Sequence, residues 1–390
     1  MKILAICQYY YPEPFRINDI CEELVKRGHK VTILTDVPNY PVGKVYQGYE
    51  KKQKREEDIN GVHVIRCATI PRKPGTIYRL LNYLSYPISS WLKVGKLPGD
   101  FDVIFVNQQS PVMMAWPGIR YAKKHHKKIV MYCMDLWPAS LVAGGILPSS
   151  LIYRLFYRIS KHVYQKADRI LVTSRMFKPY LHEEFGIAEA KLDYLPQYAE
   201  GIFDYMEPRK PDGLFNLLFA GNIGTAQSLD TIIDAAERVK FSPVHFYIVG
   251  GGVELERLKK CVEEKHLTSV TFLGQKPLEE MPQLYKTADA MLVTLQKDPV
   301  LSLTLPGKVQ SYMASGRPII GAADGETNAA INEAQCGFCG PADDGEELAK
   351  NIIRFIGAED KAGMGLNGRK YYEEHFDKNR FMDKLEREIQ

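Results

Sequence analysis

The feature that most constrains the fold is an alternation of short apolar segments with longer amphipathic ones. The short segments are rich in Ile, Val and Leu, which is typical of strands buried on both faces of a parallel sheet. Parallel strands need a crossover connection, usually a helix, and the longer segments supply it. The strands predicted in the first half are Lys2–Cys7, Lys30–Thr35, Val62–Ala68, Val103–Asn107, Lys128–Met134 and Arg169–Thr173.

The alternation restarts after a stretch rich in Pro and Gly, residues 200–213, which we predict to be a linker. We therefore expect two doubly wound α/β domains, residues 1–204 and 205–369, with a ligand in the cleft between them. Residues 370–390 are predicted to form an amphipathic helix, and packing back on the first domain is one arrangement open to it. The strands predicted in the second half are Asn216–Ala220, His245–Val249, Val270–Leu273, Ala290–Thr294 and Pro318–Gly321.

Composition restricts the class of protein. Of the 390 residues, 45% are hydrophobic and 25% are charged, which are usual values for a soluble globular protein. No apolar run is long enough to span a membrane, and the N-terminal run is too short for a signal peptide. The seven cysteines are scattered, and Cys336 and Cys339 form a lone CxxC pair without partners at zinc spacing. We expect a cytoplasmic protein with no disulfide framework, no metal site and no cofactor.

The charge is distributed unevenly along the chain. Residues 1–200 contain 29 Lys and Arg against 18 Asp and Glu, whereas residues 201–390 contain 22 against 29. Within residues 70–175 there are 16 basic and four acidic residues, interleaved with aromatic side chains. A basic face with aromatic neighbours suits an anionic membrane surface, and no nucleic-acid motif accompanies it. The alternative is a solvated face of ordinary helices.

The segment from Pro306 to Ile320 contains the clearest ligand signal. Pro306 is predicted to open a helix and Gly316 to close it, with a short strand directly after. Lys308 then lies in the first turn, where a cation opposes the helix dipole unless an anion is bound. A phosphate is such an anion, so we expect a nucleotide or sugar phosphate here.

Glycine-rich turns follow three predicted strands of the second half. Gly221 and Gly224 allow close approach to a ligand before a predicted helix at 226–239, although a plain tight turn is the alternative. The turn at Gly250 and the loop Gln275-Lys276-Pro277 end the next two strands, where a nucleotide base can lie against the backbone. For these two, a simple connecting turn is the alternative reading.

Carboxylates follow two strands of the first half. Asp135 comes directly after a strand, where α/β sheets bind ligands, and we expect it to contact a sugar hydroxyl or developing positive charge unless it only caps a helix. Glu13 follows the first strand in a similar position. Asp100-Phe-Asp102 matches a metal-binding DxD pattern, but it precedes its strand, so we interpret it as a solvated turn.

With these residues placed, the chain resembles glycosyltransferase family 4. This resemblance implies the GT-B fold, in which two Rossmann-like domains face each other across a cleft, the first binding the acceptor and the second the nucleotide sugar. The matching segments are Arg27–Leu34, Phe219–Gly224, Val270–Gly274, Pro306–Lys308 and Tyr312–Pro318.

Further segments resemble the N-acetyl-L-fucosamine transferases of bacterial O-antigen and capsule assembly, whose acceptors are membrane-bound polyprenyl-diphosphate sugars. These segments are Tyr11–Asp19, Pro38–Pro41, Asp135–Pro138 and Gly221–Gln227.

The chain departs from the family in two places. Leu303 and Ser311 stand where the family carries two glutamates. A glutamate can bind both ribose hydroxyls, whereas a serine hydroxyl offers one short contact, so the resemblance does not extend to ribose recognition by a carboxylate here or to the usual glutamate near the donor sugar. The paired glycines that follow the first strand in many members are replaced by residues 15–18, in which Arg16 is either a phosphate or acceptor contact or a surface charge.

The resemblance implies a retaining, metal-independent transferase that moves a sugar such as N-acetyl-L-fucosamine from a UDP-sugar to a polyprenyl-diphosphate-linked saccharide, at the inner face of the cell membrane. The alternatives are a non-hydrolysing UDP-sugar epimerase and a non-catalytic sugar-nucleotide-binding subunit. The expected catalytic residues are Asp135 and Lys308; the donor and diphosphate contacts are Gly221, Asn222, Gly224, Gln227, Lys308 and Ser311; the base region is Gly250, Gln275, Lys276 and Pro277; and the acceptor side is Glu13, Arg16 and Asn18.

Overall fold

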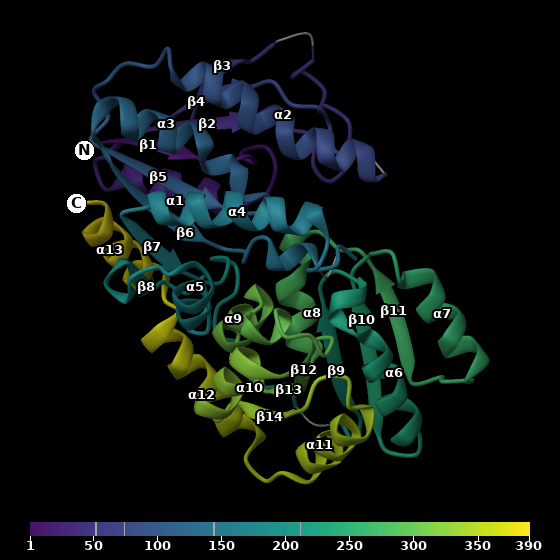
Figure 1. The fold of residues 1–390 in the computed structure, drawn as a ribbon. Coiled ribbons are helices and arrows are strands. Elements are labelled where there is room, and N and C mark those ends of the chain that lie inside the picture. The colour runs from purple at the N-terminus through teal and green to yellow at the C-terminus, as the bar shows by residue number, and fades with distance from the viewer. Residues whose placement is uncertain (51–52, 74, 143–144, 211) are drawn as a thin grey trace. The chain divides into compact units, whose positions relative to one another are not determined.

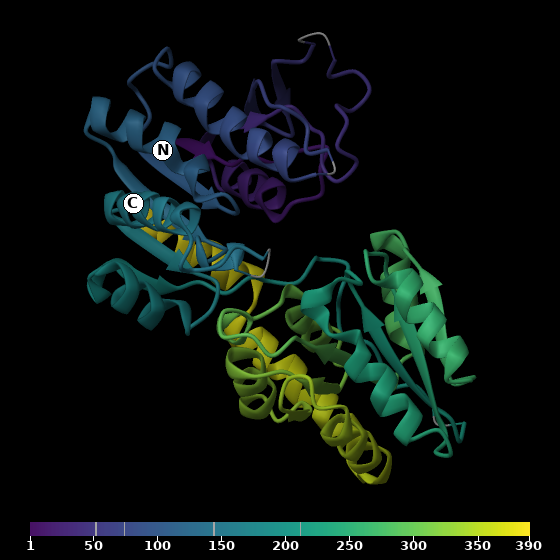
Figure 2. The ribbon, with the colours of Figure 1, turned by 45° about the vertical axis from the view of Figure 1, so that its right-hand side comes forward.

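The computed structural model describes residues 1–390 except 51–52, 74, 143–144 and 211, the last of which lies in the predicted linker. The chain folds into two compact α/β units, shown in Figure 1 and Figure 2. The first unit contains Met1–Thr173, Phe177–Leu195 and Met382–Gln390, and the second contains Ser174–Met176 and Pro196–Phe381.

The first unit is built on a sheet in the order β3-β4-β2-β1-β5-β6-β7-β8. All neighbours are parallel except β3 and β4. Its central strands are buried, as their runs of apolar residues predict. The strands are β1 (Lys2–Ile6), β2 (Lys30–Asp36), β3 (Glu56–Ile59), β4 (Val62–Cys67), β5 (Val103–Gln108), β6 (Lys128–Cys133), β7 (Arg169–Val172) and β8 (Leu192–Tyr194).

The helices of this unit begin and end at recognisable signals. Helix α1 is followed by Gly28, which has a left-handed φ of 89°. Helix α4 begins after Ser150, whose Oγ accepts the N–H of Tyr153 at 3.2 Å. Helices α2, α3 and α4 pack in sequence beside one another. The bounds are α1 (Arg16–Lys26), α2 (Thr76–Val94), α3 (Trp116–His125), α4 (Leu151–Lys166), α5 (Phe177–Phe185) and α13 (Lys378–Ile389).

The second unit has a parallel sheet in the order β11-β10-β9-β12-β13-β14. Its strands are β9 (Phe215–Ala220), β10 (Val244–Val249), β11 (Val270–Gly274), β12 (Ala290–Thr294), β13 (Ile319–Ala322) and β14 (Gly337–Gly340). Its helices are α6 (Leu229–Arg238), α7 (Leu255–Glu264), α8 (Met281–Thr287), α9 (Gly307–Ala314), α10 (Gly325–Glu333), α11 (Gly345–Gly357) and α12 (Lys361–His375).

The end of the chain is held by the first unit through ion pairs of α13. Arg27 lies 2.6 Å from both Asp383 and Glu386, and the side chain of Arg169 lies 2.6 Å from Glu388. These contacts join α13 to the end of α1 and to β7. Residues 382–390 therefore pack with the first unit, which is one arrangement that the amphipathic pattern allowed.

The predicted linker is part of the second unit. Phe203 and Met206 are buried in its core, so the compact units divide at Leu195, before the predicted boundary at residue 204. Because these two apolar side chains are buried in the core of the second unit, the segment belongs to that unit and is not a separate linker.

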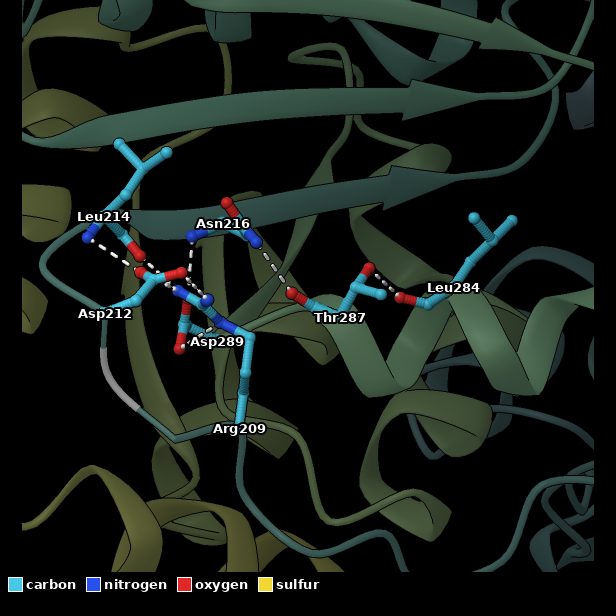
Figure 3. Close-up of polar contacts among 7 residues, drawn as sticks. All are labelled: Arg209, Asp212, Leu214, Asn216, Leu284, Thr287 and Asp289. Carbon is cyan, nitrogen blue, oxygen red and sulfur yellow. Dashed lines mark hydrogen bonds and ion pairs between the residues drawn. The ribbon is translucent and has the colours of Figure 1, made fainter.

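A largely buried ion-pair cluster fixes the chain where it enters β9 (Figure 3). The Asp289 carboxylate accepts hydrogen bonds from Arg209 Nη2 at 2.9 Å and from the backbone N–H of Asn216 at 2.7 Å. Arg209 Nη1 also donates to Asp212 at 2.7 Å. The Asp289 side chain is 10% exposed, whereas that of Asp212 is 61% exposed. Arg209 therefore ties the predicted linker to the beginnings of β9 and β12.

We expect Asp289→Ala to lower the free energy of unfolding by about 2–3 kcal/mol, because it removes the buried acceptor of Arg209 Nη2 and of the backbone N–H of Asn216. Asp212→Ala removes a solvated partner of the same arginine and is the matched control, with an expected loss much smaller than that of Asp289→Ala because the Asp212 carboxylate is exposed to water. Urea denaturation of both variants measures the difference, and equal losses would contradict a dominant role for Asp289.

Candidate functional site

Three loops at the carboxyl ends of β9, β10 and β11 contact one another through their backbones. The N–H of Gly221 donates to Val249 O at 3.0 Å, that of Ile223 to Gly251 O at 2.8 Å and that of Gly250 to Gly274 O at 2.9 Å. A Cβ at Gly250, where φ is 143°, would lie 1.8 Å from Gly221 O. Gly250 is therefore needed for loop packing itself, in addition to any approach of a ligand, whereas a Cβ at Gly221 would lie 2.8 Å from Lys308 Nζ.

Lys308 lies in the first turn of α9 and points toward the first of these loops. Its Nζ donates to Gln227 Oε1 and lies 4.0 Å from the centre of the Phe219 ring. No carboxylate forms an ion pair with it in the described part of the chain. Burial lowers the pKa of Lys308 to about 7. A bound anion would raise the pKa of this amine, because a nearby negative charge stabilises the protonated form.

The loop that carries Gln227 is fixed by hydrogen bonds to the backbone of that residue. Gln227 O accepts Thr294 Oγ1 at 2.5 Å, and the N–H of Gln227 donates to Gly224 O at 3.0 Å. Ser228 has a left-handed φ of 45°, so the helix α6 begins at Leu229. The predicted start at residue 226 is wrong, because residues 225–227 form a separate 3-10 turn. The left-handed backbone of Ser228 separates this turn from the helix.

Of the other residues predicted for the donor, Asn222 lies in the loop after β9 and Ser311 lies on α9. Asn222 is exposed, and its Nδ2 would lie 2.6 Å from a Cβ at Gly224. Ser311 is 5% exposed, and its Oγ donates to Glu200 Oε2 at 3.3 Å and to Gly307 O at 3.4 Å.

The residues predicted for the base region lie after β10 and β11. Gln275 and Pro277 are exposed, and Gln275 Oε1 would lie 3.6 Å from a Cβ at Gly251. Lys276 forms a 3.7 Å ion pair with Glu280 in the next turn. The structure thus places Gln275 beside the Gly250 turn, whereas the ammonium group of Lys276 is paired with Glu280.

In the first unit, Asp135 follows β6 and binds the loop after β5. Its Oδ2 accepts the N–H of Ser110 at 3.1 Å and Ser110 Oγ at 3.2 Å. Burial raises the pKa of the Asp135 carboxyl, and the two bonds from Ser110 partly offset this. The carboxylate makes no capping bond to the short turn after it, at residues 139–141. Asp135 is therefore held in position by Ser110.

Glu13 is buried and binds the loop after β2. Its Oε1 accepts the N–H groups of Asn39 at 2.7 Å and Tyr40 at 2.6 Å. Burial raises the pKa of Glu13 to about 7, although these two bonds oppose the rise. Asp36 lies in the same cluster, and burial together with the Glu13 charge raises its pKa well above the usual value. Among the residues that the structure describes, Oε2 of Glu13 and Oδ1 of Asp36 have no hydrogen-bond partner.

Arg16 and Asn18 lie at the beginning of α1, beside this cluster. Asn18 Nδ2 donates to Glu13 O at 2.8 Å and so stabilises the turn that precedes the helix. Arg16 is half-buried. Burial raises the pKa of the Tyr132 phenol on β6, and the positive charge of Arg16 partly opposes this rise. The structure therefore brings Glu13, Arg16 and Asn18 to one end of the first sheet.

The DxD sequence lies at the opposite, amino end of this sheet. Lys2 Nζ forms a 2.5 Å ion pair with Asp100, and the N–H of Lys2 donates to Asp102 Oδ2 at 2.7 Å. These contacts join the beginnings of β1 and β5. Among the described residues there is no group of three or more His, Cys, Asp or Glu side chains that could hold a metal ion.

Sequence reasoning missed several polar groups that belong to these sites: Asp36, Asn39, Ser110 and Glu200. Asp36 directly follows the strand predicted at Lys30–Thr35 and gave a usable signal, since it occupies the same sheet edge as Asp135. The other three reach their partners over 26, 25 and 111 positions, and no local pattern marks them.

Comparison with known proteins matches both halves of the chain. Residues 16–197 match the family model of Glycosyltransferase Family 4, and residues 215–358 match that of Glycosyl transferases group 1. A protein of Escherichia coli strain K12, named as the colanic acid biosynthesis glycosyl transferase WcaI, is 28% identical over 340 residues, which cover 81% of this chain and 82% of that protein.

Two solved structures share the fold over nearly the whole chain. Sucrose-phosphate synthase of Thermosynechococcus elongatus has a TM-score of 0.75 at 17% identity, covering 99% of this chain and 97% of that one. HepE of Anabaena, solved in complex with UDP and glucose, has a TM-score of 0.72 at 15% identity, covering 100% and 99%. Both likenesses support the same two-unit α/β fold, GT-B.

The low pKa of Lys308 gives a test of its burial. Between pH 7 and 10.5, the unfolded chain protonates this lysine and the folded chain does not, so its contribution to stability rises with pH. In Lys308→Met this contribution is absent. We therefore expect the variant's stability advantage over wild type to be largest below about pH 7 and to shrink by a few kcal/mol toward about pH 10, at about 1.4 kcal/mol per pKa unit.

Urea denaturation across this pH range measures the advantage. Lys259→Met removes an exposed lysine of the same unit and is the control, for which the difference from wild type should not depend on pH in this way. A pH-independent difference for Lys308→Met would show that the amine titrates near its ordinary pKa.

Proposed function

Because residues 16–197 match the model of Glycosyltransferase Family 4 and residues 215–358 that of Glycosyl transferases group 1, the chain belongs to glycosyltransferase family 4, and we propose that it transfers a sugar from a UDP-sugar to a lipid-linked saccharide. The relative named for colanic acid biosynthesis supports a role in making a surface polysaccharide, and the UDP complex of HepE supports a uridine nucleotide as the leaving group. Our proposed donor is an N-acetylated deoxyhexosamine such as N-acetyl-L-fucosamine.

The environment of Lys308 carries the proposal. The Lys308 amine is buried with no carboxylate partner in the described ranges of the chain, so it is costly to protonate, yet it lies beside a glycine loop at the carboxyl edge of the sheet. A diphosphate supplies the missing negative charge, and charge-assisted bonds to phosphate are strong when water is excluded. Lys308 would therefore gain its proton together with the ligand.

The proposed chemistry depends mainly on position and charge. As the bond from the sugar to the diphosphate breaks, negative charge grows on the departing phosphate oxygen, and Lys308 would stabilise it. Asp135, fixed by Ser110, would contact the sugar or the acceptor hydroxyl. We propose retention of configuration through attack from the face that the diphosphate leaves, without a metal ion.

The surface of the first unit supports a membrane-bound acceptor. A groove of about 590 Å³ lies over α2, α3 and α4, and its lining combines basic side chains with two Trp rings. Arg120 stacks at 3.7 Å from the centre of the Trp91 ring. The residues that line the groove are Trp91, Trp116, Ile119, Arg120, Lys123, Lys124 and His162.

Exposed aliphatic side chains continue this surface along α2 and α4. Leu151 is 81% exposed, and Ile88, Leu92, Ile152 and Leu155 are each more than half exposed. We propose that aliphatic groups enter an anionic bilayer while lysines and arginines contact its head groups, with the enzyme at the inner face of the cell membrane. In the described part of the chain, no helix is both long and apolar enough to cross a membrane.

The transfer reaction is tested by mixing single UDP-sugars with a short polyprenyl-diphosphate-linked saccharide and following UDP and product by mass spectrometry. We expect UDP release that depends on the acceptor, and a loss of kcat/KM of about 100-fold or more in Lys308→Met. A new UDP-sugar without UDP release would identify an epimerase, and neither product would identify a binding subunit. Full activity of Lys308→Met would contradict its proposed role.

Membrane association is tested by co-sedimentation with vesicles that contain anionic phospholipid. We expect Leu151→Ser combined with Leu155→Ser to weaken binding about tenfold or more, since each buried methylene contributes roughly 0.8 kcal/mol. Phe241→Ser, which removes an exposed ring from the second unit, is the control. Binding that is absent at both low and high salt would contradict the proposal.

A further inference from the structure

A carboxylate from a distant segment lies against the helix that carries Lys308. Glu200 Oε2 accepts the hydroxyl of Ser311 at 3.3 Å, and the two residues are 111 positions apart. Glu200 is half-buried and Ser311 is buried. Both residues belong to the second unit, so this contact is internal to it.

The segment around Glu200 is firmly held. Glu200 O accepts the N–H of Phe203 at 2.9 Å, and the Phe203 ring stacks on Tyr285 with centres 4.8 Å apart. The N–H of Met206 donates to Ser315 O at the end of α9 at 3.1 Å. The carboxylate is therefore supported by core packing on one side and by α9 on the other, which limits its movement.

The spacing along α9 suits a nucleotide. Lys308 and Ser311 are three residues apart, so they share one face of the helix and differ by about 4.5 Å along its axis. With a diphosphate at Lys308, the next group of a nucleotide on this face is its ribose. A carboxylate accepts bonds from two neighbouring hydroxyls, and α/β nucleotide sites commonly bind ribose hydroxyls with an acidic side chain.

We propose that Glu200, oriented by Ser311, binds the 2′- and 3′-hydroxyls of the ribose of the donor nucleotide. The carboxylate that helix α9 lacks at position 311 is thus supplied from the segment that enters the second unit. Glu200 then determines specificity for ribonucleotides over 2′-deoxyribonucleotides. This inference rests on the proposed use of a nucleotide-sugar donor.

The test measures binding of UDP and 2′-deoxy-UDP by titration calorimetry to the full chain. For wild type we expect UDP to bind at least about tenfold more tightly than 2′-deoxy-UDP. Glu200→Gln should weaken UDP binding by about 10- to 100-fold while changing 2′-deoxy-UDP binding much less, so the preference shrinks toward one.

A transplanted carboxylate separates recognition from structural support. In the double variant Glu200→Gln with Ser311→Glu, the carboxylate is moved to α9, and we expect the preference for UDP to return. Ser311→Ala should weaken UDP binding only a few-fold, since the carboxylate loses its orienting bond and is kept. Thermal unfolding of each variant identifies any loss of the fold.

The outcomes distinguish this inference from the proposed function. If wild type binds UDP and Glu200→Gln keeps its preference over 2′-deoxy-UDP, the inference is wrong, and a lower melting temperature would then assign Glu200 to structural support alone. A double variant that folds but does not regain the preference also overturns it. If wild type binds neither nucleotide, the proposed donor is wrong and the inference falls with it.

Discussion

Parallel pairing of strands is the constraint on which the rest of the structure depends. In the second unit, the register Leu217 with Phe246 and Ala220 with Val249 brings the ends of β9 and β10 to the same level. The loops that leave these strands must then share a small space, and only glycine at 250 avoids a collision with Gly221 O. The same pairing in the first unit brings Glu13, Asp36 and Asp135 to one edge of its sheet.

The two units use this edge differently. In the second, a glycine loop and a single buried amine form a site that is favourable for an anion. In the first, buried carboxyls hold loops in place: Glu13 through the backbone of Asn39, and Asp135 through Ser110. Lys308 and Glu13 both have a pKa that burial moves to about 7, from opposite directions. Each exchanges its proton readily when the local charge changes.

Strand prediction succeeded where apolar side chains are buried on both faces. All predicted strands are present, because segments such as Val103–Asn107 have no polar face and must lie inside a sheet. The strands that were missed, β3, β8 and β14, lie at the sheet edges. β3 has the sequence Glu-Glu-Asp-Ile and pairs on one side only, and β14, from Gly337 to Gly340, contains two glycines. These strands form by pairing with a neighbouring strand, and their own local β-propensity does not predict that pairing.

The sequence by itself determined the two α/β units, the glycine turns and the position of Lys308 in the first turn of a helix, since all of these follow from local patterns of apolar, glycine and proline residues. Only the tertiary structure decided that Glu200 meets Ser311, that Ser110 holds Asp135, and that Lys308 is buried with no carboxylate partner among the described residues. The physical reason is that hydrogen bonds and desolvation act through space, and packing decides which distant segments become neighbours.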